Sequence, residues 1–248
     1  MLRLLLLAFV FLALASASGA QPIVTDRPDF TESPLAVEPG RIQIEFGATF
    51  QETADDFQRF NAPEALARIG VLGGVELRLG LPEYVRVEAG GPPRVVREDA
   101  SEPSIGAKLE LGEASGIPLG LIVESTIPVL NGVDLEEAAQ TVILTGSADL
   151  SERFSLGSQI QGTYNDTPET LDLGATLVLG FSVDDQIGTF AEFLFTRQAS
   201  RDPGTELVFH TGATVLLTED FQLDAHGGIG LTGESPRYLL GVGASARF

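Results

Sequence analysis

Apolar and polar residues alternate along most of this 248-residue chain. The clearest example is 42–50, where apolar side chains take every second position from Ile42 to Phe50. The last segment, 238–248, repeats the pattern and ends on Phe248. A two-residue period predicts β-strands, and about ten residues is the length that a tilted strand needs to cross a bilayer.

The same alternation recurs between these two segments and predicts twelve strands in all. The inner ten are expected at 66–71, 75–81, 105–111, 117–127, 142–150, 154–165, 171–181, 187–195, 207–217 and 221–231. Short links near 72–74, 112–116, 151–153, 182–185 and 218–220 alternate with longer ones near 52–63, 82–102, 129–139, 166–169, 198–204 and 232–236. An even strand number with this loop asymmetry is typical of outer-membrane barrels, whose termini lie on the periplasmic, short-turn side.

The predicted fold is therefore all-β: an antiparallel, up-and-down transmembrane barrel of about twelve strands. A secreted β-sandwich would give the same alternation. Two observations count against the sandwich. The apolar sets occur on every strand, both terminal ones included, and the opposite faces are rich in Gly, Gln, Thr and charge. A sandwich core would not accept such polar groups unpaired.

The first twenty residues have the layout of a secretory signal peptide. Arg3 precedes an apolar run from Leu4 to Leu14, and a tail of small residues, 15–20, follows. The run is too short for a comfortable spanning helix, although an N-terminal membrane anchor is the alternative. Cleavage is expected after Ala17 or Ala20, which leaves residues 21–40 as an N-terminal segment and 41–248 as the barrel.

Composition narrows the classes of partner and cofactor. The net charge of −20 disfavours nucleic acid and a polybasic membrane surface. The absence of cysteine excludes disulfides, thiolate-bound metals and cysteine nucleophiles. No cofactor is expected. The expected partners are outer-membrane lipid, a small solute of unknown identity, and the export and barrel-assembly machinery.

The N-terminal segment, residues 21–40, holds four prolines and four acidic residues, which disfavour helix and sheet. Its charges need polar partners. We therefore expect Asp26, Arg27, Asp29 and Glu32 to lie inside or across the periplasmic mouth and pair with lumen charges. A disordered periplasmic leader is the alternative.

At residues 25–34 the sequence TDRPDFTESP resembles the family described as "Putative MetA-pathway of phenol degradation". Further similar stretches continue to the C-terminus, at 37–40, 43–45, 63–66, 68–70, 75–80, 106–109 and 241–248. The chain departs from the family in lacking Trp, in having only three Tyr, and in its looser ending at 127–132. The resemblance implies an outer-membrane barrel, often described as a transporter, with a link to aromatic solutes but to no reaction in these residues.

Charged residues at the expected inward positions are the candidates for selectivity. They are Arg41, Glu45, Arg68, Glu76, Arg78, Lys108, Glu110, Glu124, Glu192, His210, Asp224, His226 and Arg247. The basic ones concentrate on the first four strands and the last, so we expect a mixed wall that faces an acidic one. Walls of carboxylates favour cations. The alternative is that these charges pair across strands and fill a narrow barrel without an open pore.

The two histidines are expected on neighbouring strands, with Glu192 opposite His210 and with His226 diagonal to it, near Asp224. Such a pair orients an imidazole for base chemistry. Satisfied lumen polar groups are the alternative, and we favour it. No Gly-x-Ser-x-Gly elbow occurs, and the inward Ser155 and Ser245 are not on strands adjacent to His210. We therefore expect neither an enzyme nor a metal site.

The functional expectation is passage of small solutes, including aromatic or hydrophobic ones, across the outer membrane without catalysis. A structural or adhesive barrel with a filled lumen is the second hypothesis, and an outer-membrane hydrolase is the third. The long link 82–102 is expected to extend the third strand as a ribbon up to a Pro/Gly tip. It could either stay exposed or fold inward and gate the pore.

Overall fold

The computed structural model describes residues 21–53, 57–89, 95–128, 139–166, 169–197 and 204–248. Within these ranges the chain forms strands and irregular links, and no helix there is long and apolar enough to cross a membrane. The expected signal peptide, residues 1–20, and its two cleavage positions lie outside the described residues.

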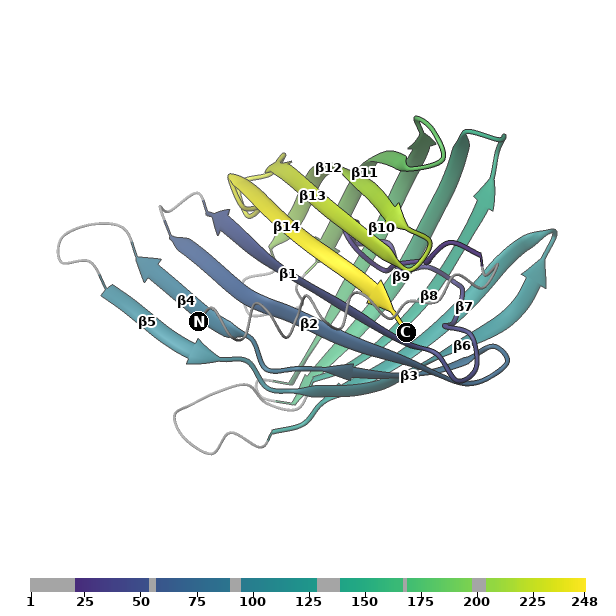
Figure 1. The fold of residues 1–248 in the computed structure, drawn as a ribbon. Coiled ribbons are helices and arrows are strands. Elements are labelled where there is room, and N and C mark those ends of the chain that lie inside the picture. The colour runs from purple at the N-terminus through teal and green to yellow at the C-terminus, as the bar shows by residue number, and fades with distance from the viewer. Residues whose placement is uncertain (1–20, 54–56, 90–94, 129–138, 167–168, 198–203) are drawn as a thin grey trace, which may run out of the picture.

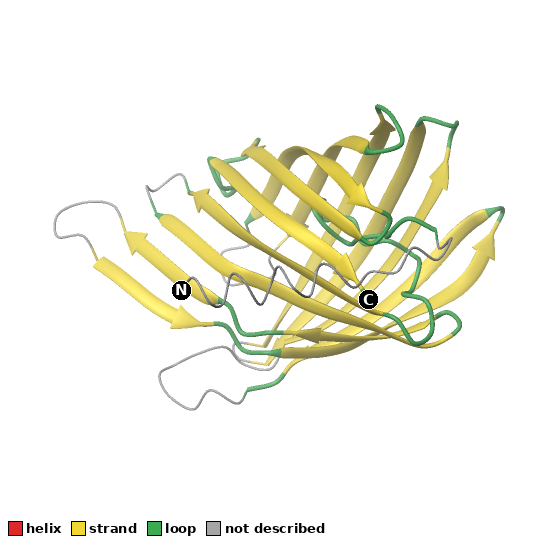
Figure 2. Cartoon of the chain, in the orientation of Figure 1, coloured by secondary structure: helices red, strands yellow, loops and turns green. Residues whose placement is uncertain are grey.

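Fourteen strands form one antiparallel sheet that closes on itself (Figures 1 and 2). They are β1 (Ile42–Glu52), β2 (Gln58–Leu72), β3 (Val75–Gly80), β4 (Tyr84–Ala89), β5 (Val95–Ala100), β6 (Ser104–Ala114), β7 (Ile117–Thr126), β8 (Ala139–Asp149), β9 (Phe154–Asp166), β10 (Glu169–Ser182), β11 (Ile187–Arg197), β12 (Thr205–Thr218), β13 (Phe221–Gly230) and β14 (Tyr238–Arg247). Closure follows because β1 pairs with both β14 and β2. The predicted twelve-stranded antiparallel meander is confirmed, since β4 and β5 lie outside the closed ring of twelve.

The two extra strands correct the prediction for the long links. The stretch 52–63 was expected to be a loop, yet β2 begins at Gln58 and pairs with β1 from there. The N-terminal part of β2, from Gln58 to Ala62, also pairs with β4, and β4 forms a hairpin with β5. This hairpin continues the wall beyond the ring, at the left of Figure 1, and does not fold inward. The Pro/Gly tip at 90–94 lies outside the described residues.

The long-loop rim is less uniform than the sequence suggests. The link near 166–169 was expected to be loose, but β9 runs to Asp166 and β10 begins at Glu169. Alternating sequence on both sides continues the pairing there, up to Glu169 opposite Asp166. Other links on this rim, such as 231–237, remain irregular.

The two faces of the sheet carry opposite chemistry. Outward side chains are apolar and exposed on every side of the barrel, as with Phe46 on β1, Leu177 on β10 and Val242 on β14. Inward side chains are polar and buried. Because strand residues alternate between faces, the two-residue sequence period directly produces an apolar exterior and a polar lumen.

The N-terminal segment enters and leaves the barrel at the short-turn rim. Near its start the Ile23 N–H donates to the Glu219 carbonyl in the β12–β13 turn, at 2.7 Å. Near its end the Gly40 N–H donates to the Gly70 carbonyl, at 2.9 Å. Between these two points the segment lies inside the barrel, where Figure 1 shows it in purple.

Candidate functional site

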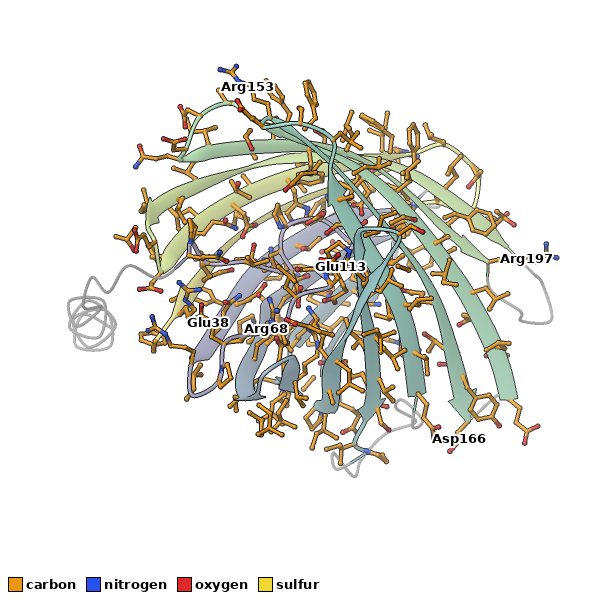
Figure 3. All side chains as sticks on the ribbon, turned by 90° about the vertical axis from the view of Figure 1, so that its right-hand side faces the viewer. Glu38, Arg68, Glu113, Arg153, Asp166 and Arg197 are labelled. Carbon is orange, nitrogen blue, oxygen red and sulfur yellow. The ribbon has the colours of Figure 1, made fainter. Side chains whose placement is uncertain are left out.

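The lumen is the candidate site, and its core is built from charged side chains. The largest fully buried side chains include Arg68, Lys108, Glu76, Glu192 and His210. Figure 3 labels Arg68 among the many side chains that fill the interior. Buried charges are costly unless they are paired and hydrogen-bonded, so the arrangement of partners decides what this interior can do.

Asp26 is the centre of the most densely charged part of the lumen. Its carboxylate lies 2.7 Å from Lys108 Nζ, 2.6 Å from an Arg78 nitrogen and 3.2 Å from an Arg68 nitrogen. These four residues are called the Asp26 cluster below. Burial alone would raise the pKa of Asp26, but the three cations outweigh it and hold that pKa well below its usual range. Asp26 therefore stays ionised at any physiological pH.

The wall cations of this cluster also have acidic partners on the wall. Arg68 lies 2.9 Å from Glu45 and 2.8 Å from Glu76, and Arg78 lies 3.2 Å from Glu76. The basic residues thus do sit together, on the adjacent strands β2, β3 and β6, but carboxylates surround them. The wall here is a paired network and not a bare positive surface.

Glu32 adds a second carboxyl group from the N-terminal segment to the same cations. It lies 3.1 Å from Arg78 and 3.7 Å from Lys108. Burial and the neighbouring Asp26 carboxylate raise the pKa of Glu32 from 4.5 to about 8, against the opposing effect of the two cations. Within this pair of carboxyl groups Asp26 carries the charge and Glu32 holds a proton near neutral pH.

Arg27 connects the N-terminal segment to two further wall carboxylates, on β2 and β13. Its guanidinium lies 3.1 Å from Glu64 on β2 and 3.4 Å from Asp224 on β13. The room for it comes from glycine. A Cβ on Gly243 would lie 2.5 Å from Arg27 Nε, so a larger residue there would collide with the guanidinium.

From Thr31 onward the segment follows the circumference of the lumen. Successive contacts are Thr31 with Thr176 on β10, the Glu32 N–H with Gln159 on β9, the Glu32 carbonyl with Thr145 on β8, the Ala36 N–H with Glu110 on β6, and the Val37 N–H with Glu76 on β3. On β7, Gly120 admits Pro34, because a Cβ there would lie 2.8 Å from Pro34 Cα. The segment thus forms a layer across the lumen and is bound by strands from most of the circumference. This layer is called the disc below.

The histidines form a chain with Glu192, which is called the histidine chain below. Glu192 and His210 are directly opposite on β11 and β12, and Glu192 Oε2 lies 2.9 Å from His210 Nδ1. His210 Nε2 lies 2.8 Å from His226 Nδ1 on β13. Glu192 also accepts hydrogen bonds from the Phe30 N–H at 3.0 Å and from the Thr31 hydroxyl at 2.6 Å.

The remaining predicted residues lie near the rims or beside the contacts already described. Arg41 precedes β1 and lies 3.9 Å from Glu38. Glu110 is exposed and accepts the Ala36 N–H at 2.8 Å. Arg247 binds Asp220 and the carbonyl of Gln21 at the short-turn rim. Glu124 lies 3.8 Å from Arg78, at the edge of the Asp26 cluster. Asp29 has a pKa raised well above its usual range by burial and by the carboxylate of Glu192.

Sequence reasoning missed the neutral partners of the segment. Gln43, Thr145, Gln159, Thr176 and Gln222 are buried and face it. Their inward parity was readable, but nothing in the sequence showed that a separate segment would use them. Glu64, which binds Arg27, was missed because the stretch 52–63 was expected to be a loop that ended just before it.

The geometry offers little to a metal or a nucleophile. Among the described residues, no group of three or more His, Asp or Glu side chains is arranged to hold a metal ion. Within the same part of the chain, the hydrogen bonds of His210 and His226 go to Glu192 and to each other and not to a serine. What the arrangement can do is hold a peptide segment inside a charged, polar lumen.

A comparison with known families identifies the chain. The model of the family described as "Putative MetA-pathway of phenol degradation" matches residues 25–248. The chain belongs to this family. The match begins at the TDRPDFTESP run and thus includes the lumen part of the N-terminal segment as well as the barrel. No curated protein matches the chain significantly.

Solved structures with the same fold are outer-membrane proteins. The chain is similar to an outer membrane channel from Pseudomonas putida F1, with a TM-score of 0.67 and 14% identity over 94% of this chain and 100% of that one. The KdgM porin aligns with a TM-score of 0.58 and 11% identity over 83% and 99%. The CymD monoaromatic hydrocarbon channel aligns with a TM-score of 0.50 and 7% identity over 86% and 89%. This member of the family therefore has the fold of an outer-membrane barrel.

Proposed function

We propose that the chain is an outer-membrane channel for small solutes and that its N-terminal segment forms an internal constriction. The observation that carries the proposal is the disc of chain around Asp26 inside a polar lumen. A barrel that served only as a wall would need no separate segment held by carboxylates of β1, β3, β6 and β11. In this proposal both termini face the periplasm, because the short turns and Phe248 share one rim.

A cavity of about 490 Å³ opens on the other side of the constriction. Its floor includes Asp26, Arg27 and Glu32, and its walls include residues next to the long links, such as Arg59, Glu102 and Thr126. We assign it as the vestibule that a solute enters from outside. Seven acidic residues against three arginines line it, and a cavity with that balance concentrates cations.

The lining bears on the class of solute. Its hydrogen-bonding groups favour polar or cationic solutes, whereas the family description suggests aromatic ones. Small aromatic molecules with polar substituents satisfy both conditions. Uptake into protein-loaded liposomes would separate the classes, with an aliphatic polyol, an organic cation and a hydroxylated aromatic compared at equal size. Equal rates for all three would contradict selection by this lining.

Conductance of the refolded protein in a planar bilayer tests the constriction. Deletion of residues 21–36 should raise single-channel conductance, because it removes the disc and leaves the vestibule continuous with the periplasmic mouth. Glu38→Gln is the matched control, since that side chain is 52% exposed at the rim and should leave conductance unchanged. Unchanged conductance in the deletion would contradict the constriction. No conductance in either form would favour the structural or adhesive barrel.

The ratio of cation to anion permeability tests the charge of the passage. We expect potassium to be favoured over chloride, and we expect Glu124→Gln to lower the preference because Glu124 lines the vestibule and is about one-third exposed. An anion preference would contradict the assignment of this cavity as the route. We propose no catalytic role, and an esterase assay with a chromogenic ester should give only the background rate.

A further inference from the structure

The histidine chain touches the N-terminal segment at one residue, Glu192. One oxygen of this carboxylate accepts both the Phe30 N–H and the His210 Nδ1–H, and the other accepts the Thr31 hydroxyl. The Phe30 ring also packs on the His210 ring, with centroids 4.7 Å apart. A change in the positions of Glu192 and His210 would therefore weaken the contacts that hold Phe30 and Thr31 of the segment.

The hydrogen-bond geometry assigns the proton positions along this chain. The Glu192 carboxylate is the acceptor for the Phe30 N–H and the Thr31 hydroxyl, and as the acceptor for His210 too it places the imidazole proton on Nδ1. His210 Nε2 then holds a lone pair, and His226 donates its Nδ1–H to it. The remaining nitrogen, His226 Nε2, is left with a lone pair. It is buried without a hydrogen-bond partner, and its ring lies against the backbone of Gly241.

Every site in this arrangement that could bind one additional proton is energetically unfavourable. Only one hydrogen fits between His210 Nε2 and His226 Nδ1, so a third imidazole proton must sit on His226 Nε2. That position would then be a buried N–H without an acceptor, which is much more costly than a buried lone pair. Protonating Glu192 instead would replace an acceptor that three donors share.

The charges around the histidines add to this effect. Arg27 faces His226 from the N-terminal segment, and Asp224 on the same strand is engaged by Arg27. Glu192 faces His210 from β11, and His226 faces it from β13. Asp29 faces Glu192 from the segment, with a pKa raised by burial and by that carboxylate, so Asp29 does not supply a compensating negative charge in acid. On the side of β14 the neighbour of His226 is Gly241, which carries no charge.

We propose that the histidine chain is an acid-sensitive contact that releases the N-terminal segment when it takes up a proton. This inference rests on the proposed function, because release matters only if the segment constricts the channel. The buried Nε2–H of protonated His226 can find an acceptor only if the His226 ring turns away or the hydrogen bond between the two histidines breaks. Either movement frees His210 and Glu192 from their present positions and loosens Phe30, Thr31 and the chain that follows them up to Leu35, while Asp26 keeps its own cationic partners.

A spin label on the segment measures release without relying on conductance. The chain has no natural cysteine, so Leu35→Cys gives a single attachment point. Leu35 is 41% exposed, which leaves space for the label. Glu32 and Asp29 bind protons in the docked segment and therefore favour docking in acid, so the titration is made in a Glu32→Gln, Asp29→Asn background. There we expect an immobilised spectrum at pH 7.5 and a mobile fraction that grows reversibly below about pH 6, near the ordinary imidazole range. With one linked proton, the ratio of released to docked segment should rise by up to about tenfold per pH unit.

His226→Gln is the decisive variant. A glutamine amide can donate to His210 Nε2 at neutral pH and can turn to accept from it once His210 is protonated. The variant should keep the segment docked and lose the acid response. Glu206→Gln on β12 is the matched control, because it removes a titratable group from the strand that carries His210 but not from the histidine chain. Its acid response should equal that of the unmodified chain.

The outcomes separate this inference from the proposed function. An immobile label at every pH down to 4.5, or an equal acid response in His226→Gln, would overturn the acid-sensitive contact. If deletion of residues 21–36 still raises conductance in that case, the constriction stands and only its regulation is refuted. A mobile fraction that appears in acid but leaves conductance unchanged would support the contact and refute the constriction.

Discussion

The N-terminal segment is held at two places that differ in how they respond to protons. At the Asp26 cluster, three buried cations hold the pKa of Asp26 well below its usual range, so the charge of Asp26 persists across the physiological range. At the histidine chain, the two hydrogen bonds of His210 form only while the two imidazoles together carry two ring protons. The comparison teaches that acid can leave the Asp26 contacts of a segment intact while it breaks the contacts of the same segment with the histidine chain.

Asp26→Asn should have the largest effect on this comparison. Arg68, Arg78 and Lys108 would lose the anion that they share, and all three side chains are buried. Breaking a buried ion pair by removing one partner costs about 3–5 kcal/mol. The segment should therefore leave the lumen at neutral pH, as seen by a mobile label at position 35 and by raised conductance.

Asp26→Glu is the companion to that variant, since it keeps the charge and adds one methylene. It should restore most of the docking. If Asp26→Asn left the label immobile at neutral pH, the cluster would not be what holds the segment in the lumen, and the contrast between the two sides would fail.

Gly120→Val tests the fit of the segment to the wall without changing any charge. The added side chain would begin 2.8 Å from Pro34 Cα and equally close to its carbonyl oxygen, so the backbone of the segment must shift. Overpacking of this kind typically costs about 1–3 kcal/mol. Gly188→Val is the matched control on an inward position of β11, where a Cβ meets only the Thr214 hydroxyl. Docking should weaken in the first variant and persist in the second.

The sequence predicted the wall better than it predicted the partners on it. Alternation is a local property, and it assigned Arg68, Glu192 and His210 to the lumen face before any pairing was known. Hairpin folding then placed Glu192 opposite His210, and the register agrees with that placement. It could not show which of several inward carboxylates Asp26 would avoid and which cations it would join, since that depends on how a separate, irregular segment folds in space.

A β-bulge explains another failure of the sequence prediction. The register of β1 with β2 shifts between Gly47 and Thr49, so that Glu64 faces inward on one side of the shift and Asn61 and Arg59 on the other. A strict two-residue period cannot continue through such a shift. The sequence prediction placed a loop at 52–63, whereas pairing with β1 and β4 makes the chain from Gln58 onward a strand.

Glu32→Gln isolates the alkaline side of the pH dependence. In the docked segment the pKa of Glu32 is raised from 4.5 to about 8, so the docked state binds the extra proton. Docking should therefore be strongest at low pH with respect to this group and weaken as pH rises from 4.5 through 8. Between pH 7 and about 8.5 the released fraction should grow by somewhat less than tenfold. The glutamine variant, which resembles the protonated carboxyl group, should show no such alkaline change.

The two pH responses oppose each other between pH 4.5 and 8, because a fall in pH strengthens docking through Glu32 and weakens it through the histidine chain. Glu32→Gln should therefore make the acid response of the histidine chain larger than in the unmodified chain. If Glu32→Gln removed the acid response as well, the two sides would be one coupled unit and not two independent attachments.

The smallest effect is expected from an ion pair that matches the Asp26 cluster in distance but not in burial. Arg237 lies 2.8 Å from Glu52, close to the 2.7 Å between Lys108 and Asp26, yet the Arg237 side chain is 52% exposed. Water solvates such a guanidinium whether or not the pair forms, and exposed pairs contribute about 0–1 kcal/mol. Arg237→Gln should leave the label at position 35 immobile and shift the urea midpoint of the refolded barrel only slightly. A loss of docking comparable with that of Asp26→Asn would show that distance and not burial sets the strength of these contacts, and it would remove the basis for treating the lumen cluster as special.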